Sequence, residues 1–257
     1  MLYEELLAAS KPRFDAFFSR VHTFENQFTW NGFNAQCYNR MYTDSSAHGI
    51  APTWKLKREI PGLSDMCRKC ADYFIPARNQ SIPKYDVLLG EQMEEELMKF
   101  LSGKLGVKVE RGDIDNKSYP DCVIRNRDGG IAAYFELKYH AAPFVCAYKF
   151  TKRECYEGSA TLDYGKIKKQ LELIEREIRV PVYYVHWIDY PCLKGIFYES
   201  AEMVKAHMAQ QHAEFERKKR QGDEKKSPGA RYLSKIYSYL SDLNSFEDMI
   251  EEFKALL

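Results

Sequence analysis

The sequence predicts an α/β protein, and two observations carry this prediction. Apolar side chains recur at helical spacing over residues 90–105 and again over 164–178. Short apolar runs, which are typical of strands, begin after Gly106 and occupy 123–124, 131–139 and 181–188. The predicted order from residue 90 to residue 188 is therefore helix, three strands, helix, strand.

The first predicted helix carries an apolar stripe and several glutamates. The stripe consists of Leu97, Met98, Phe100, Leu101 and Leu105. Glu94 falls on the inward face with this stripe, whereas Glu91, Glu95 and Glu96 fall on the polar side. A carboxylate on an inward face is costly unless a positive group meets it. Glu94 is either a half-exposed acid that complements the helix dipole or a carboxylate associated with a metal.

The next strands are predicted to form a hairpin, because Asp128-Gly129 is a favoured turn between them. A turn centred on this dipeptide places Asp121 directly opposite Glu136, with Cβ atoms roughly 5 Å apart. Odd-numbered residues of 131–139 then face the core, and Glu136 and Lys138 lie on the other face.

The same hairpin is expected to bring the apolar faces of both strands together, with Cys122 facing Leu137 and Ile124 facing Phe135. A loop of three residues would shift the pairing by one position. Asp121 would then turn toward the core, unless a β-bulge restored the register.

The chemistry of the hairpin follows from its carboxylates. Two acidic groups that converge on one point can hold a hard divalent cation such as Mg²⁺. An amine beside that cation, here Lys138, can orient or help to deprotonate an attacking water, which suits hydrolysis of a phosphodiester. The acidic-x-Lys tripeptide is not specific by itself, since Glu216-Arg217-Lys218 and Glu252-Phe253-Lys254 match it in stretches predicted to be helical.

The second predicted helix places Ile167, Leu171, Ile174 and Ile178 on one apolar face. The run 181–188 (PVYYVHWI) is nearly continuous in apolar residues, which fits a strand buried on both faces. With Pro120-Asp121 and Glu136-Leu137-Lys138, the stretch 90–188 resembles the PD-(D/E)xK nuclease superfamily. The Gly-x-x-Met-Glu-x-x-Leu spelling around Glu94 is similar to the usual start of that family's first helix.

The resemblance implies a restriction-endonuclease-like fold, a mixed sheet flanked by helices, and roles for individual residues. Asp121 and Glu136 would ligate Mg²⁺, for which Mn²⁺ would substitute, and Glu94 and the carbonyl of Leu137 would assist. Lys138 would position the nucleophilic water. One of Gln170, Lys166 and Lys169 would support the site from the second helix, and the sequence does not choose among them.

The resemblance thus implies a Mg²⁺-dependent nuclease that acts on DNA, with a restriction-like endonuclease and double-stranded DNA as the expectation. The alternative is a catalytically inactive copy of the fold that only binds nucleic acid. The intact set of Asp121, Glu136 and Lys138 favours the active enzyme. Whether the protein is a homodimer stays open.

Composition bounds the class of protein. The chain has 257 residues, of which 45% are hydrophobic and 29% are charged. Its formal net charge of +1 argues against a protein that coats nucleic acid without specificity, such as a histone-like protein. No stretch reaches the roughly 18 apolar residues of a membrane span, and the N-terminus lacks the basic start of a signal peptide. The expectation is a cytoplasmic protein with no membrane partner.

The seven cysteines are an odd number scattered along the chain, which favours reduced thiols. Cys67 and Cys70 form a Cys-x-x-Cys, for which Cys37 and His48 are the nearest further zinc ligands. Ser64 reads as a helix N-cap, so both thiols are expected on an apolar helix face with Met66 and Phe74. This interpretation is preferred to a structural zinc.

The chain is expected to divide into three parts. Residues 1–85 form a mainly helical region, with helix signals at Ser10-Lys11-Pro12 and after Ser64. The aromatic and amide side chains of 24–42 either form its core or contact bases as a target-recognition segment. Residues 86–198 form the nuclease core.

The third part, 199–257, is expected to be a helical extension with a basic loop. One helix is predicted through about Glu216, and an amphipathic helix over 232–257 with Leu233, Ile236 and Leu240 on its apolar face. Between them, 217–231 is rich in basic residues and contains Gly and Pro. It is either a solvated loop or a segment that binds DNA phosphates through Lys218, Lys219, Arg220, Lys225 and Lys226.

Overall fold

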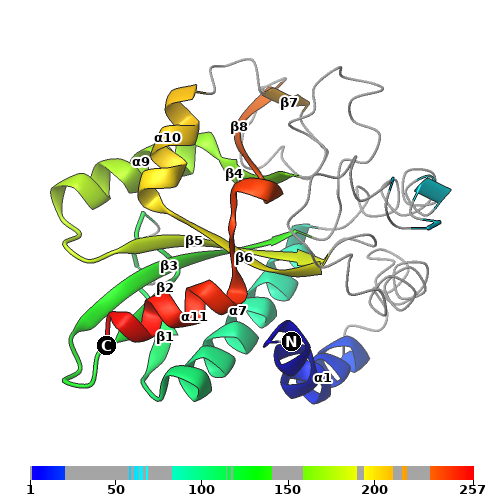
Figure 1. Cartoon of the computed structure of the whole chain (residues 1–257), viewed down its shortest axis with the longest axis horizontal. Coiled ribbons are helices and arrows are strands. Elements are labelled where there is room, and N and C mark those ends of the chain that lie inside the picture. The colour runs from blue at the N-terminus through cyan, green and yellow to red at the C-terminus, as the bar shows by residue number, and fades with distance from the viewer. Residues whose placement is uncertain are drawn as a thin grey trace.

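The computed structural model describes residues 2–20, 58, 61–62, 64–65, 68, 83–113, 115–116, 118–140, 159–189, 194–210, 216–218 and 232–257. These residues form an α/β fold (Figure 1). Its elements follow one another in this order: α1 (Leu2–Arg20), α7 (Pro83–Leu105), β1 (Val109–Arg111), β2 (Cys122–Arg125), β3 (Ile131–His140), β4 (Ser159–Asp163), α9 (Tyr164–Arg176), β5 (Val182–Asp189), β6 (Lys194–Ser200), α10 (Ala201–Gln210), β7 (Glu216–Lys218), β8 (Tyr232–Tyr239), the 3-10 helix η6 (Leu240–Asp242), β9 (Asn244–Ser245) and α11 (Phe246–Ala255).

The main sheet has six strands in the order β1-β2-β3-β5-β6-β9. β3 and β5 run parallel, whereas the other neighbours are antiparallel, so the sheet is mixed. The α/β class that the sequence predicts is confirmed. All eight residues of β5 are buried, as expected for a strand covered on both faces.

Helices cover both faces of the main sheet. In Figure 1, α1, α7 and α11 lie on one side of it, and α9 and α10 lie on the other. The first face packs into a hydrophobic cluster that includes Leu6, Leu97, Phe135, Trp187 and Phe253. The second face packs into a cluster that includes Leu162, Ile167, Tyr184, Val204 and Ile236. Successive side chains of β3 and β5 therefore point into different cores, and the polar residues of the predicted site lie on the α9 side.

The structure of α7 confirms the predicted apolar stripe but corrects the predicted exposure of one glutamate, Glu96. The helix begins at Pro83 rather than near Gly90, and Leu97 and Leu101 are fully buried. Glu96, which is expected on the polar side, is also fully buried. Arg13 of α1 is the reason: its Nε donates to the two carboxylate oxygens of Glu96 at 2.7 and 2.6 Å. The spacing within α7 cannot reveal that α1 covers this side.

The C-terminal part differs from the expectation. α10 ends at Gln210, and Glu216 begins strand β7, so Glu216-Arg217-Lys218 is not helical. Residues 232–239 form strand β8 instead of a helix, and α11 begins only at Phe246, after an N-terminal capping box formed by Ser245 and Asp248. β8 pairs with β4 and β7 in a second sheet. The aromatic and β-branched residues of β8 favour a strand, and this pairing outweighs the helical spacing.

Among the described residues, no helix combines the length and the apolar content that a membrane crossing requires.

Candidate active site

The β2–β3 hairpin positions the two carboxylates of the predicted site. Cys122 pairs with Phe135 and Val123 with Tyr134, so the next pair in this register is Asp121 with Glu136, as predicted. The turn is longer than predicted, because the amide of Asn126 donates to the carbonyl of Gly130 at 2.9 Å and encloses residues 127–129. Gly129 supplies the left-handed φ of 85° that this turn needs.

A β-bulge restores the register that the longer loop would have shifted. Arg125 pairs with Ile131, whereas Ile124 pairs with Ala133, so Ala132 is the additional residue of the bulge. The individual partners expected for two core residues were wrong: Cys122 pairs with Phe135 rather than Leu137, and Ile124 with Ala133 rather than Phe135. A difference of two positions keeps each side chain on the core face, because side chains alternate with a period of two.

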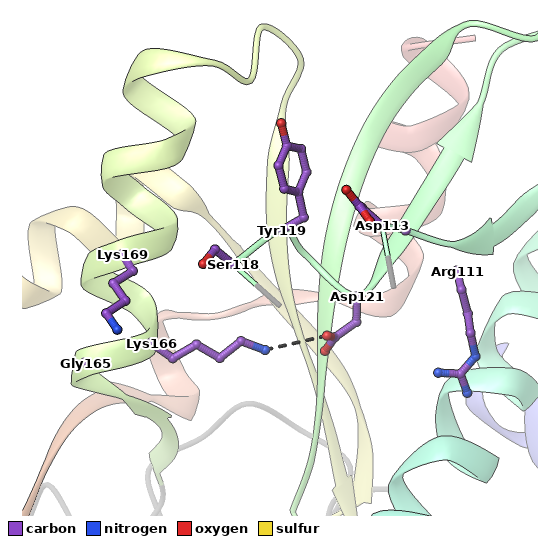
Figure 2. A pocket seen from close by; sticks show the side chains of 9 residues that line it. Arg111, Asp113, Ser118, Tyr119, Asp121, Gly165, Lys166 and Lys169 are labelled. Carbon is purple, nitrogen blue, oxygen red and sulfur yellow. Dashed lines mark ion pairs between the residues drawn. The ribbon is translucent and has the colours of Figure 1, made fainter. Parts of the chain in front are cut away.

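Asp121 and Glu136 converge on the face of the sheet that α9 covers. Their carboxyl groups lie close enough that Glu136 raises the pKa of Asp121. The ammonium group of Lys166 contacts both: Nζ lies 3.6 Å from Asp121 Oδ1, drawn as a dashed line in Figure 2, and forms an ion pair with Glu136 Oε1. A cation is thus accommodated between the two predicted ligands.

Glu136 is fully buried, and both of its oxygens have partners. Lys138 and Lys166 donate to Oε1, and Gln170 Nε2 donates to Oε2 at 3.1 Å. Gln170 is held in turn by the Tyr184 hydroxyl, which donates to its Oε1 at 3.3 Å. Of the three second-helix candidates, Lys166 and Gln170 therefore touch the carboxylate pair, whereas Lys169 lies exposed at the neighbouring cavity.

The charged groups of this cluster shift one another's pKa values. Burial would raise the pKa of Glu136, but Lys138 and Lys166 outweigh it and lower this pKa to about 2. Burial and the negative charge of Glu136 raise the pKa of Asp121. Burial would lower the pKa of Lys138, but Glu136 and Asp121 raise it above its ordinary value. Lys138 is therefore a charged hydrogen-bond donor to Glu136 in this arrangement.

Glu94 lies half-buried on α7, and the positive group that meets it is Arg111 at the end of β1. Arg111 Nη1 donates to Glu94 Oε2 at 3.0 Å. Burial and the charge of Asp121 nevertheless raise the pKa of Glu94 to about 7, against the opposing effects of Arg111 and Lys138. Glu94 is thus a third carboxyl group in the electrostatic neighbourhood of the pair.

The donor set fits a hard cation with few protein ligands. In the part of the chain that the structure describes, no three His, Cys, Asp or Glu side chains surround one point as a preformed cage. Mg²⁺ commonly binds through one or two carboxylates and keeps several waters, so Asp121 and Glu136 alone meet its requirement. The side chain of Leu137 is buried in the hydrophobic cluster that contains Leu97 and Phe135. That its carbonyl is a further metal ligand stays a prediction.

A cavity of about 650 Å³ adjoins Asp121 (Figure 2). The segment from β1 to β2 forms one wall, and the first two turns of α9 form the other; the lining residues are Arg111, Gly112, Asp113, Ser118, Tyr119, Asp121, Gly165, Lys166 and Lys169. The amide of Gly112 donates to the carbonyl of Asp121 at 2.8 Å and closes this segment. A Cβ at Gly112 would lie 2.5 Å from the carbonyl oxygen of Pro120, so this close approach requires glycine.

A second polar cluster, the Glu199 cluster, lies on the same face of the sheet and consists of His140, His186, Glu199, His207 and Ser238. Glu199 is fully buried, and it interacts with His186 Nε2 at 2.8 Å, with His207 Nδ1 at 3.1 Å and with the Ser238 hydroxyl at 2.8 Å. His140 Nε2 lies 3.1 Å from His186 Nδ1. Burial would raise the pKa of Glu199, but these donors lower it to about 2.

Sequence reasoning missed Arg111, Tyr119 and the Glu199 cluster. Two signals were present: Tyr119 directly precedes Pro120-Asp121, and His186 interrupts the otherwise apolar run of β5. Nothing in the sequence pairs Arg111 with Glu94, seventeen residues earlier.

Several predictions fall outside the described residues. Cys67 and Cys70 lie there, as do the aromatic segment 24–42 and the basic residues Lys219, Arg220, Lys225 and Lys226. Lys218 ends strand β7, and only its backbone is described.

No model of a known protein family matches the chain, and no curated protein matches it. The geometry above is therefore what bears on function.

Proposed function

We propose that this protein is a Mg²⁺-dependent nuclease with a restriction-endonuclease-like core, and that it hydrolyses phosphodiester bonds of DNA. The observation that carries the proposal is the convergence of Asp121 and Glu136 from adjacent strands, with Lys138 on the same face and a cavity beside them. The order α7-β1-β2-β3-β4-α9-β5 supports it, since this is the order that the resemblance implies apart from β4, which belongs to the second sheet.

Each residue has a role in this proposal. Asp121 and Glu136 would hold the metal, which when bound would polarise a phosphoryl oxygen and lower the pKa of a coordinated water. Lys138 donates from its charged ammonium group to the attacking water or to a phosphoryl oxygen, and it stabilises negative charge that develops in the transition state. Gln170, fixed by Tyr184, keeps the carboxylate of Glu136 oriented.

The second candidate is a nuclease-fold protein that binds nucleic acid without cleaving it. One observation favours this candidate: the ammonium group of Lys166 already occupies a position between the two carboxylates. In the active enzyme Lys166 would have to leave this position for a metal to bind, and its charge would then be available to substrate phosphates in the cavity.

The test is cleavage of plasmid and duplex oligonucleotides in Mg²⁺ and in Mn²⁺ by the full chain. We expect cleavage by the wild type and none by Asp121→Asn, because the substitution removes half of the ligand charge. Asp128→Asn is the matched control, since Asp128 is an exposed aspartate in the hairpin turn, away from the site. DNA binding without cleavage in either metal would select the second candidate, and cleavage by Asp121→Asn at the wild-type rate would reject the site.

A further inference from the structure

We infer that the cavity beside Asp121 holds one unpaired nucleotide of the substrate strand, next to the phosphate that is cleaved. This inference rests on the proposed nuclease function and adds a substrate class to it. The substrate is a strand with a single-stranded, frayed or flipped-out nucleotide at the cleavage point, rather than a continuously paired duplex.

The size of the cavity is the first argument. About 650 Å³ is within the range of sites that enclose a small ligand, roughly 300–1,000 Å³. A base that enters must leave the stack, and this costs least when the base is already unpaired.

The chemistry of the lining is the second argument. Arg111, Lys166 and Lys169 line the cavity; Arg111 is paired with Glu94, and Lys166 with Asp121 and Glu136. No carboxylate among the described residues pairs with Lys169, so its charge is available to a phosphate. The carboxylate of Asp113 is engaged elsewhere, because its Oδ1 accepts the amides of Asp115 at 3.0 Å and Asn116 at 3.2 Å.

Tyr119 supplies the aromatic surface. Its ring contacts Tyr134 edge to face with centroids 6.0 Å apart, and its hydroxyl donates to Glu177 Oε2 at 3.4 Å. These two contacts fix the ring in the cavity wall, only two residues before the metal ligand Asp121. Bases of any sequence stack on such a ring, because each of them has a π-face. Because Tyr119 and Asp121 line the same cavity, a base stacked on Tyr119 would lie in the cavity that Asp121 borders.

Gly165 provides an independent argument. It lies in the first turn of α9 and lines the cavity, and a Cβ added there would meet nothing within 4 Å. Its backbone does not need glycine, since its φ is not in the left-handed region, and glycine weakens a helix relative to alanine. What the missing side chain does provide is free space beside Lys166, at the place where the nucleotide would lie.

Two pairs of variants test this site. Gly165→Leu fills the cavity, and Gly103→Leu is its matched control, because Gly103 is an exposed helical glycine on α7 whose Cβ position is equally open and lies outside the cavity. Tyr119→Leu removes the ring, whereas Tyr119→Phe keeps the ring and removes only the hydroxyl contact with Glu177. Circular dichroism and thermal melting establish that each variant is folded.

The first readout is binding of a single-stranded oligonucleotide that contains 2-aminopurine, with Ca²⁺ in place of Mg²⁺. We expect about tenfold weaker binding for Gly165→Leu and Tyr119→Leu, the effect of losing one base–aromatic stack. Tyr119→Phe and Gly103→Leu should bind like the wild type. Equal binding by Gly165→Leu and Gly103→Leu would overturn the inference, as would equal loss in Tyr119→Phe and Tyr119→Leu.

The second readout is cleavage in Mg²⁺ of one sequence in fully paired form and in a form with an unpaired stretch. We expect at least about tenfold faster cleavage of the unpaired form, and loss of this preference in Gly165→Leu. Equal rates on both forms would overturn the inference and leave the nuclease intact. No cleavage of either form, with 2-aminopurine binding still lost in Gly165→Leu, would reject the nuclease and retain the nucleotide site.

Discussion

Glu136 and Glu199 are two fully buried carboxylates that lie in one row across the main sheet, with Tyr184 between them. The pKa of each is lowered to about 2, because donors outweigh the effect of burial. Their surroundings differ. Glu199 interacts with two histidines and a serine, whereas Glu136 shares Lys166 with a second carboxylate, Asp121, which borders a cavity. Burial and a lowered pKa are therefore common to both carboxylates, and the second acid beside a cavity is what singles out Glu136 as part of the proposed active site.

Among variants that keep both carboxylates, the largest effect is expected for Lys138→Ala. Cleavage should fall by about 10²–10³-fold or more, the effect of removing one preorganised donor from the transition state. Mg²⁺ and DNA binding should change little, because Asp121 and Glu136 remain. Single-turnover cleavage and calorimetric Mg²⁺ titration measure the two quantities. Lys168→Ala, an exposed lysine on the same helix as Lys166, is the control. Normal cleavage by Lys138→Ala would remove this residue from the mechanism.

Glu199→Ala should affect stability and not chemistry. Removing one partner of a buried charged network costs about 3–5 kcal/mol in the free energy of unfolding. Urea denaturation should show this loss, while the cleavage rate per folded molecule stays normal. The exposed Glu172→Ala on α9 should change the free energy of unfolding by less than about 0.5 kcal/mol. A loss of cleavage as large as that of Lys138→Ala would merge the two clusters into one functional unit.

The pH dependence of stability provides a finer test of the Glu199 cluster. The pKa of Glu199 is about 2 in the folded state and 4.5 as its ordinary value. Because the folded pKa is the lower one, this stabilisation is complete above about pH 4.5 and is lost as the pH falls toward 2. It amounts to at most about 3 kcal/mol. The difference in unfolding free energy between the wild type and Glu199→Gln should shrink over this range, and a constant difference would contradict the assignment.

The smallest effect is expected at Glu94. Its pKa of about 7 leaves it protonated in the metal-free protein below that pH, and a metal binds only the ionised carboxylate. Mg²⁺ affinity should therefore weaken below about pH 7, by no more than about tenfold per pH unit for one proton. Glu94→Gln should abolish this inflection in a calorimetric titration series. An inflection that persists in Glu94→Gln would place Glu94 outside the metal site.

Local patterns predicted the central elements well, because their packing is recorded in the spacing of apolar residues. The stripe of α7, the fully buried strand β5 and the facing of Asp121 and Glu136 all followed from periods of 3.6 or two residues. The helix predicted over the residues of β8 was wrong, because the packing of this segment is not recorded in its local pattern. Leu233, Ile236 and Leu240 have helical spacing, and only the pairing with β4, some seventy residues away in the sequence, makes this segment a strand.

The site shows the same limit. Asp121, Glu136 and Lys138 could be predicted from a hairpin alone. The choice between Gln170, Lys166 and Lys169 could not, because it depends on how α9 is rotated over the sheet. The burial of Glu96 and the pairing of Glu94 with Arg111 likewise depend on contacts between elements that no local pattern encodes.

The bulge at Ala132 has a consequence for how this protein can change. The tip of the hairpin, residues 126–130, can gain or lose a residue, and the strand can absorb that change by losing or gaining the bulged position. Pairing from Ile124 and Ala133 onward, and with it the alignment of Asp121 and Glu136, would stay the same. We therefore expect the hairpin to tolerate changes of length at its tip, where Arg127 and Asp128 are exposed, without a change in the alignment of the carboxylates.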